Sequence, residues 1–337
     1  MAIHYKEIAN RLRAFRLGSG LSADEIAKRV GISRTALYRF EKGELAKIET
    51  LEKLSELLQV SMPTLLGVGI EYMPSATSYF ERIRQFEESA EHIMVLAGPI
   101  SFLLASENFI NVLEVMLRES IPTDAPDHET SMRQVDRIIE ILRERKRNYL
   151  RRKPGMLNLI SAREVSRLLQ NGFVGNSLVK GAELERRRAL ARAEIEHFVG
   201  VIEDESIGVQ IGLVTESLPH AGFQIFRMAD SKVLTVSPFR LGEQPNVRLG
   251  VAMITSAPDA IAMHEKVVNE MWRTAKKGSV AAEHLRAILK RNEAEAEAES
   301  VAPVLPEPCK STDVPIQASE SPRSKRSRAL PVTKSPR

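Results

Sequence analysis

The chain has 337 residues, of which 43% are hydrophobic and 27% are charged, so it can form one large domain or two to three smaller ones. Its formal net charge of +4 permits a polyanionic partner but does not require one, because solubility alone explains a modest excess. The single cysteine, Cys309, excludes an internal disulfide and a cysteine-rich zinc site.

Two short helices are predicted within residues 21–43, which read LSADEIAKRVGISRTALYRFEKG. Ser22 can cap the first helix, with Glu25 three residues later to complete a capping box. Gly31 can end that helix, because glycine readily takes a positive φ, and Ser33 can cap the second helix. Two short helices joined by a tight glycine turn are typical of a helix-turn-helix.

The second helix, residues 33–42, is predicted to have an inward and an outward face. The inward positions are Ala36, Leu37 and Phe40, and the outward positions are Arg34, Thr35, Tyr38 and Arg39. An arginine can donate two hydrogen bonds to guanine, and a threonine offers a hydroxyl or a methyl group to a base. For a lone helix, the alternative that these arginines only solvate an exposed face would be favoured.

Residues 4–66 resemble the Cro/C1-type helix-turn-helix family, also called the XRE family. The resemblance is carried by RLRAFRLGSGLS, DEIAKRVGIS and ALYRFEKGE, and IETLEKLSELLQVSMPTLL (48–66) is similar to the family's fourth and fifth helices. It implies an all-α domain of five helices that binds double-stranded DNA, with helix 33–42 as the recognition helix in the major groove.

The family pattern also implies which side chains contact DNA. The base contacts would come from Arg34, Thr35 and Arg39, and the phosphate contacts from Ser22, Ser33, Tyr38 and Lys42. For Tyr38, packing against a neighbouring side chain is an equal alternative. The family often has a phosphate-binding glutamine where this chain has Ala23, which leaves that contact open.

Residues 67–78 (GVGIEYMPSATS) are rich in glycine and small polar residues, which predicts a linker. Helical periodicity returns over 79–118. A basic helix is predicted over 131–153, and its last part, 143–153, could touch DNA phosphates or form a solvated face. We expect the rest of the chain to be organised around a group of strands.

The remaining pattern predicts an α+β regulatory and dimerisation domain over 79–291, and an α+β fold overall. Helices are expected near 161–171 and 182–204 and over 258–277 and 279–291, and strands over 206–214, 222–228, 232–239 and 247–255. Residues 292–337 (EAEAEAES, then a segment rich in proline, serine and basic residues) are expected to be a disordered basic tail, because they cannot bury enough apolar surface.

His264, Glu265 and Lys266 superficially resemble the HxK motif of phospholipase D-like proteins. Met271 stands where that motif has an acidic residue, and the segment has the pattern of an amphipathic helix, so we expect a surface histidine and lysine and no enzyme. An inactive, degenerate relative of such a domain stays open. We expect no metal and no cofactor, since the seven histidines are scattered.

The sequence thus predicts a sequence-specific, DNA-binding transcriptional regulator. A homodimer is expected, because two half-sites bind far better than one, with a small-molecule or protein effector sensed by the larger domain. The charged N-terminus and the absence of an apolar run of ~20 residues indicate a cytoplasmic protein with no contact to a membrane. The alternatives are a hydrolase-like domain targeted to DNA and an antitoxin-like regulator that binds a partner protein.

Overall fold

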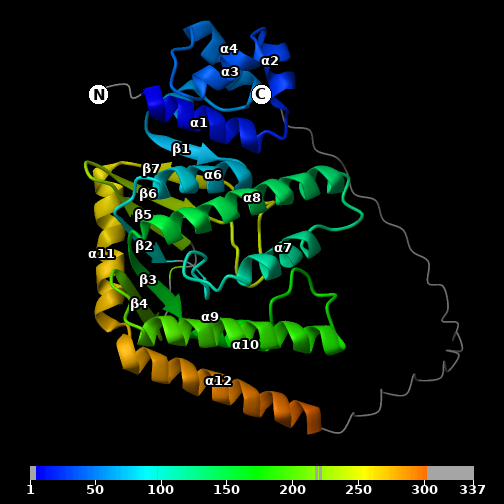
Figure 1. The fold of residues 1–337 in the computed structure, drawn as a ribbon, viewed down its shortest axis with the longest axis vertical. Helices are drawn as coiled ribbons and strands as arrows, with labels where there is room; N and C mark the ends of the chain where they lie inside the picture. The colour runs from blue at the N-terminus through cyan, green and yellow to red at the C-terminus, as the bar shows by residue number, and fades with distance from the viewer. Residues whose placement is uncertain (1–4, 97, 217–218, 220–221, 302–337) are drawn as a thin grey trace, which may run out of the picture.

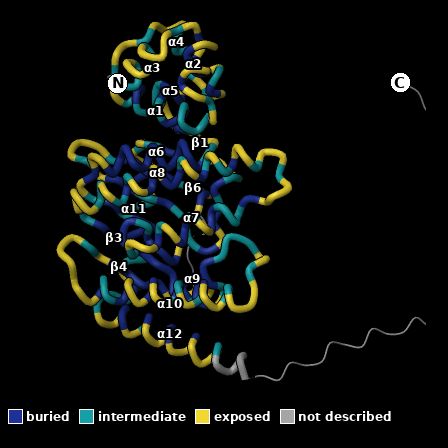
Figure 2. Tube along the Cα trace, turned by 45° about the vertical axis from the view of Figure 1, so that its right-hand side comes forward, coloured by how far each residue is buried: buried dark blue, intermediate teal, exposed yellow. Residues whose placement is uncertain are grey.

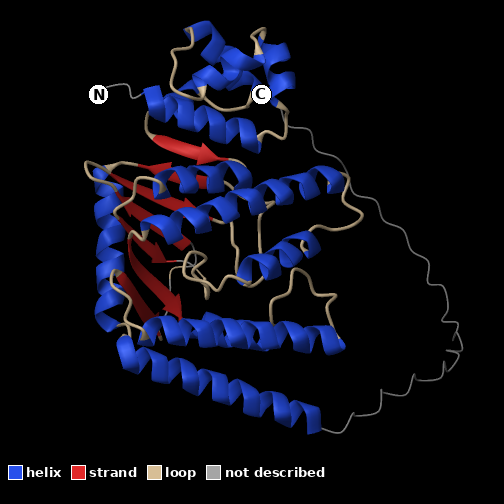
Figure 3. Ribbon diagram, viewed as in Figure 1, coloured by secondary structure: helices blue, strands red, loops and turns tan. Residues whose placement is uncertain are grey.

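The computed structural model describes residues 5–96, 98–216, 219 and 222–301 (Figure 1). A small helical domain at the N-terminus lies against a larger domain in which helices cover a seven-stranded sheet (Figure 3). This arrangement confirms the predicted α+β fold with an all-α N-terminal part. Within the described residues, no helix is both long enough and apolar enough to cross a membrane.

The N-terminal domain consists of five helices, as predicted. They are α1 (Tyr5–Gly18), α2 (Ala23–Val30), α3 (Arg34–Phe40), α4 (Ile48–Leu57) and α5 (Met62–Leu66). Ser22 and Glu25 form the predicted capping box at α2, and Gly31 ends that helix at φ 80°. The side chain of Ser33 caps α3 by accepting the backbone N–H of Ala36. Wholly buried leucines and an isoleucine hold the helices together: Leu12, Ile26, Leu37, Leu54 and Leu65.

The sheet of the larger domain is mixed. Its strands are β1 (Ile70–Met73), β2 (His92–Leu96), β3 (Gly155–Ser161), β4 (Val209–Val214), β5 (Gly222–Arg227), β6 (Lys232–Ser237) and β7 (Ala252–Thr255). Their order across the sheet is β1-β7-β6-β5-β2-β3-β4. The pairs β2–β3 and β3–β4 are parallel, and the other pairs are antiparallel.

Strand β1 lies inside the segment 67–78, which the sequence predicted to be a linker. It pairs with β7, so residues 70–73 form the edge of the sheet. One of its two buried side chains is the charged Glu71, which hid the usual apolar alternation of a strand. Glu71 can be buried because Arg11 of α1 binds it at 2.5 Å and because Arg82 binds it at 3.1 Å.

The predicted helical segment 79–118 is also divided differently. Helix α6 spans Ala76–Glu87, strand β2 follows, and helix α7 spans Phe109–Glu119. The prediction was wrong over 92–96, because a short apolar run fits a helix and a buried strand equally well. The strand at 155–161 was missed in the same way, whereas the four strands predicted after residue 206 each contain an observed strand.

Helices cover both faces of the sheet. The other helices of the larger domain are α8 (His128–Arg152), α9 (Ala162–Asn171), α10 (Gly181–Glu203), α11 (Pro258–Thr274) and α12 (Gly278–Val301). One face packs against α6 and α8, and α6 is buried along its whole length (Figure 2). Ile261 and Val268 of α11 pack on the other face. Helix α12 runs past residue 291, so 292–301 are helical and not disordered, since alanine and glutamate favour helices. Residues 302–337 of the predicted tail lie outside the described residues.

Two of the basic side chains in residues 143–153, at the end of α8, bind other parts of the larger domain. Arg145 is buried and binds Glu87 of α6 through two of its nitrogens, at 2.8–3.2 Å. Lys146 donates to the backbone carbonyl of Leu103 at 2.8 Å. These two cations therefore stabilise the larger domain and do not form a solvated face.

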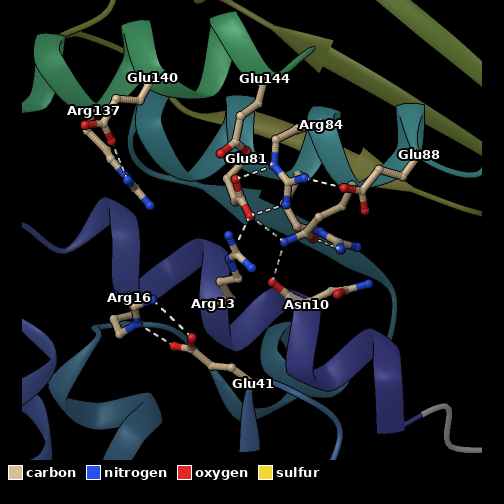
Figure 4. A network of polar contacts seen from close by, with 12 residues as sticks. Asn10, Arg13, Arg16, Glu41, Glu81, Arg84, Glu88, Arg137, Glu140 and Glu144 are labelled. Carbon is tan, nitrogen blue, oxygen red and sulfur yellow. Dashed lines mark hydrogen bonds and ion pairs between the residues drawn. The ribbon is translucent and has the colours of Figure 1, made fainter. Parts of the chain in front are cut away.

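The N-terminal domain is attached to the larger domain through α1 and α6. The helices approach closely at Gly18, where an added Cβ would lie 2.4 Å from the Ser75 hydroxyl oxygen. Farther along, Gln85 donates to the carbonyl of Asn10 at 3.1 Å, and Arg13 forms an ion pair at 3.1 Å with a buried carboxylate of α6, that of Glu81 (Figure 4). The contact between the domains is thus largely polar and charged.

Acidification is expected to weaken this contact. Burial alone would raise the pKa of Glu7 and of Glu81, but the charges and hydrogen bonds of Arg82 and Arg84 lower these pKa values below the ordinary 4.5. The stability that the two carboxylates contribute is fully present above about pH 4.5 and is lost as pH falls through their lower folded-state pKa values. Urea unfolding at neutral pH and at about pH 3 should show a smaller acid-induced loss for Glu81→Gln than for the wild type. An equal loss would contradict this interpretation.

Candidate nucleic-acid interface

Helix α3 presents one polar face to solvent. Leu37 is wholly buried and Phe40 half-buried against the rest of the domain. The side chains on the opposite face are exposed, as the sequence predicted: Arg34, Thr35, Tyr38 and Arg39. A capped helix held by its apolar side and bare on its polar side is suited to enter the major groove of DNA.

Arg34 lies at the start of this face. Its Nη1 forms an ion pair at 3.2 Å with Asp24 of α2, and its guanidinium lies 5.5 Å from the ring centre of Tyr38. The hydrogen bond to the Tyr38 hydroxyl and the charge of Asp24 raise the pKa of Arg34 above its ordinary value. Arg34 is therefore a permanent cation, and the exposed side chains of Asp24 and Tyr38 set the orientation of its guanidinium group.

Arg39 lies one turn later and binds Glu44, in the segment that follows α3, through Nε at 2.7 and 2.8 Å. Hydrogen bonding to Glu44 raises the pKa of Arg39, and the same contact lowers the pKa of Glu44. The pair is solvent-exposed, and such pairs contribute little to stability. A base edge or a phosphate can therefore replace the carboxylate at little cost.

Replacing Glu44 with glutamine is expected to strengthen DNA binding. The change removes a carboxylate that competes for Arg39 and that repels phosphates, so affinity for a duplex should rise roughly two- to fivefold at low salt. Fluorescence anisotropy with a labelled duplex measures this. Glu56→Gln removes an equal charge from an exposed position on α4 and provides the control. An equal gain in both variants would mean that only net charge matters.

An ion pair that the sequence does not predict fixes the end of α3. Arg16 of α1 binds Glu41 through both Nε and Nη2, the latter at 3.0 Å, and both side chains are largely buried (Figure 4). The Arg16 guanidinium also lies 5.7 Å from the ring centre of Tyr38. The Tyr38 ring thus lies near two arginines, which agrees with the packing role that the sequence left open. No local signal links residues 25 positions apart, so the pairing could not be read from the sequence.

The other predicted phosphate contacts are arranged in two ways. Ser22 and Ser33 are exposed but use their hydroxyl oxygens as caps, which leaves the backbone N–H groups at the helix starts as the donors available to an anion. Lys42 is exposed just past α3, and its ammonium has no partner among the described residues. The structure brings all seven predicted contact residues onto α3 or the segments beside it, and their contact with DNA stays a prediction.

The larger domain contains a cavity of about 130 Å³ near the start of β5 and the end of β6. Six of the side chains that line it are Tyr79, Phe80, Arg145, Phe223, Gln224 and Ser237. Tyr79 is wholly buried; burial raises its pKa, and its hydroxyl lies 3.2 Å from that of Thr235. Aromatic walls with a few polar groups are typical of small-molecule sites. These residues come from distant segments, so no motif in the sequence could reveal them.

The His264 motif lies on α11. A ring nitrogen of His264 is 2.8 Å from the carbonyl of Ala260, and the ring packs edge-on against Phe223 of the sheet. Glu265 binds Lys232 at 2.6 Å. The first contact lies within α11, and the other two are those of a helix packed on a sheet. In the part of the chain that the structure describes, no three histidine, cysteine, aspartate or glutamate side chains gather as a metal site would require.

Residues 12–65 match the family model described as helix-turn-helix, the family of Cro/C1-type regulators. The N-terminal domain is a helix-turn-helix domain. Its match confirms the family resemblance for this segment, which covers α2 and α3 together with the helices that pack around them. No curated protein matches the chain.

Two solved structures show a distant likeness. One is Nuc, a phospholipase D family member from Salmonella typhimurium, with 11% identity over 62% of this chain and 95% of that one, at a TM-score of 0.30. The other is TrmBL2, an archaeal chromatin protein with a novel mode of DNA binding, with 12% identity over 75% of this chain and 67% of that one, at a TM-score of 0.29. At these TM-scores neither likeness supports a functional assignment.

Proposed function

We propose that the protein is a sequence-specific transcriptional regulator that binds double-stranded DNA through α3. The observation that carries this proposal is the exposed face of α3, with Arg34, Thr35 and Arg39 on the outside of a helix-turn-helix domain in which α2 and α3 both have serine caps. Arginine and threonine are side chains that can distinguish base edges in the major groove. The arginines already sit in weak, exchangeable surface pairs.

The protein acts as a homodimer in this proposal, and in the cytoplasm. A single short recognition helix reads only a few base pairs, and two half-sites one helical turn apart, ~34 Å, bind far better than one. The larger domain would supply the dimer contacts and the response to an effector. The cavity beside Tyr79 and Arg145 supports a small molecule as that effector, since its walls combine aromatic and polar groups.

The larger domain has a regulatory and not a catalytic role in this proposal. His264 and Lys266 would be the catalytic pair of the hydrolase alternative, but His264 makes helix and sheet contacts instead. An antitoxin-like role, in which the larger domain binds a partner protein, is a further alternative. Phosphodiesterase activity that His264→Ala abolishes would favour the hydrolase.

Selection of bound sites from a pool of random duplexes, with the purified full-length protein, tests the proposal. We expect an enriched sequence made of two related half-sites, because a dimer presents two copies of α3. Enrichment of a single half-site would support DNA reading but contradict the dimer. A pool that stays random after several rounds would overturn the proposal.

A further inference from the structure

A groove lies between the helix-turn-helix domain and α8. Its volume is about 720 Å³. One wall comes from the first half of α8, with Thr130, Arg133, Gln134 and Arg137. The other wall comes from α1, from the turn after it and from the end of α3, where Tyr38, Glu41 and Lys42 are among the lining residues. Residues more than 90 positions apart thus share one surface.

The groove is strongly basic. Its lining includes five cations, Arg13, Arg16, Lys42, Arg133 and Arg137, and one carboxylate, Glu41. Glu41 is already neutralised by Arg16. Two of the cations pair with carboxylates that do not line the groove: Arg13 with the buried Glu81, and Arg137 with Glu140. The groove therefore presents an excess of positive charge to whatever enters it.

Three of these cations can accept an anion without breaking a strong contact. The ammonium of Lys42 has no partner within the described ranges. Arg133 is 68% exposed, and its nearest carboxylate, Glu129, is 3.8 Å away. Arg137 donates Nη1 to Glu140, whereas its buried Nε has no hydrogen-bond partner, and Figure 4 shows its side chain extending from α8 toward α1. An unused buried donor beside exposed cations suits an oxygen-rich anion.

The groove adjoins the proposed DNA-reading face. Tyr38 and Lys42 belong to both: they lie on or just past α3, and they line the groove. A duplex seated on α3 would place its sugar-phosphate backbone beside these two side chains. B-DNA carries one negative charge per ~1.7 Å of its axis, so a row of cations next to a bound duplex meets phosphates at once.

We infer that α8 forms a second contact with the DNA backbone, in which Arg133 and Arg137 bind phosphates across the groove from Lys42. This inference rests on the proposed function, since the duplex must first lie on α3. The contact carries no sequence information. It adds affinity and fixes the direction in which the duplex leaves the helix-turn-helix domain, because the larger domain is held against α1.

The salt dependence of DNA binding tests the inference. The slope of log Kd against log salt falls by about 0.9 for each phosphate contact that is lost. We therefore expect a slope smaller than that of the wild type by about 0.9 in Arg133→Gln and by about 1.8 in Arg133→Gln/Arg137→Gln. The loss should be equal for a selected site and an unrelated duplex of the same length. Arg133→Gln changes an exposed side chain, so this variant should fold as the wild type does.

Arg163→Gln/Arg273→Gln provides the matched control, since it removes two exposed arginines of α9 and α11, both outside the groove. An unchanged slope in the control, with the reduced slope in the groove variants, supports the inference. Equal reductions in both double variants, or unchanged slopes in the groove variants, overturn it and leave the reading role of α3 intact. A wild-type protein that binds no duplex would instead fail the proposed function.

Discussion

Replacing Arg34 with alanine is expected to weaken binding to the selected DNA site by about 5- to 150-fold, the range for loss of one good base contact. Arg34 lies at the start of α3, and the N-terminal residues of a recognition helix reach base edges most directly. Its bond to Asp24 is an exposed surface pair, so the change should leave the fold intact.

The discriminating measurement is affinity for two duplexes of equal length, one with the selected site and one without it. Arg34→Ala should lose most of its preference between them, whereas loss of a phosphate contact would weaken both alike. Arg29→Ala removes an exposed arginine from the neighbouring helix α2 and is the matched control. If Arg34→Ala weakened both duplexes equally, Arg34 would be a phosphate contact and the base-reading assignment would be wrong.

The parts of the fold that the sequence predicted well are those specified by neighbouring residues. The box formed by Ser22 and Glu25, the turn at Gly31 and the cap at Ser33 each depend on residues within a few positions. The apolar faces of α2 and α3 repeat at helical spacing. Together these local signals fix two helices and the turn between them, and they also determine which side of α3 is exposed.

The parts that could not be predicted depend on distant partners. Glu71 is buried in an edge strand only because Arg11 and Arg82 neutralise it, 60 positions before and 11 positions after it. Read alone, a glutamate between glycines and a proline predicts a linker, and the linker expected at 67–78 contains that strand. The groove against α8 could not be predicted for the same reason, because its walls come from segments that are far apart in the sequence and close only in the folded chain.

Replacing Arg82 with methionine is expected to lower the free energy of unfolding by about 3 kcal/mol. Removing one partner of a buried ion pair leaves the charge of the other partner buried and uncompensated. The Arg82 side chain is 1% exposed. It donates to Glu71 at 3.1 and 3.2 Å, to Glu7 at 3.2 Å and to Gln85 at 2.7 Å. Methionine retains the apolar stem beside Phe86 but provides none of these donors.

Urea unfolding measures this loss. Arg286→Met is the control, since it breaks an exposed ion pair with Glu203 by the same substitution and should change stability far less. Equal unfolding free energies in the two variants would show that Arg82 contributes no more than a surface arginine.

The location of the loss decides what the Arg82 network does. Arg82 joins α6 to α1 through Glu7 and to β1 through Glu71, so its removal should loosen the contact between the two domains before the sheet itself unfolds. Limited proteolysis should then cut near residues 67–69, between α5 and β1, faster in Arg82→Met than in Arg286→Met. Faster cleavage at that position would identify the network as the attachment of the helix-turn-helix domain. Faster cleavage throughout the larger domain would show instead that Arg82 stabilises the core of that domain. In that case, the other contacts between α1 and α6 would hold the two walls of the groove in place.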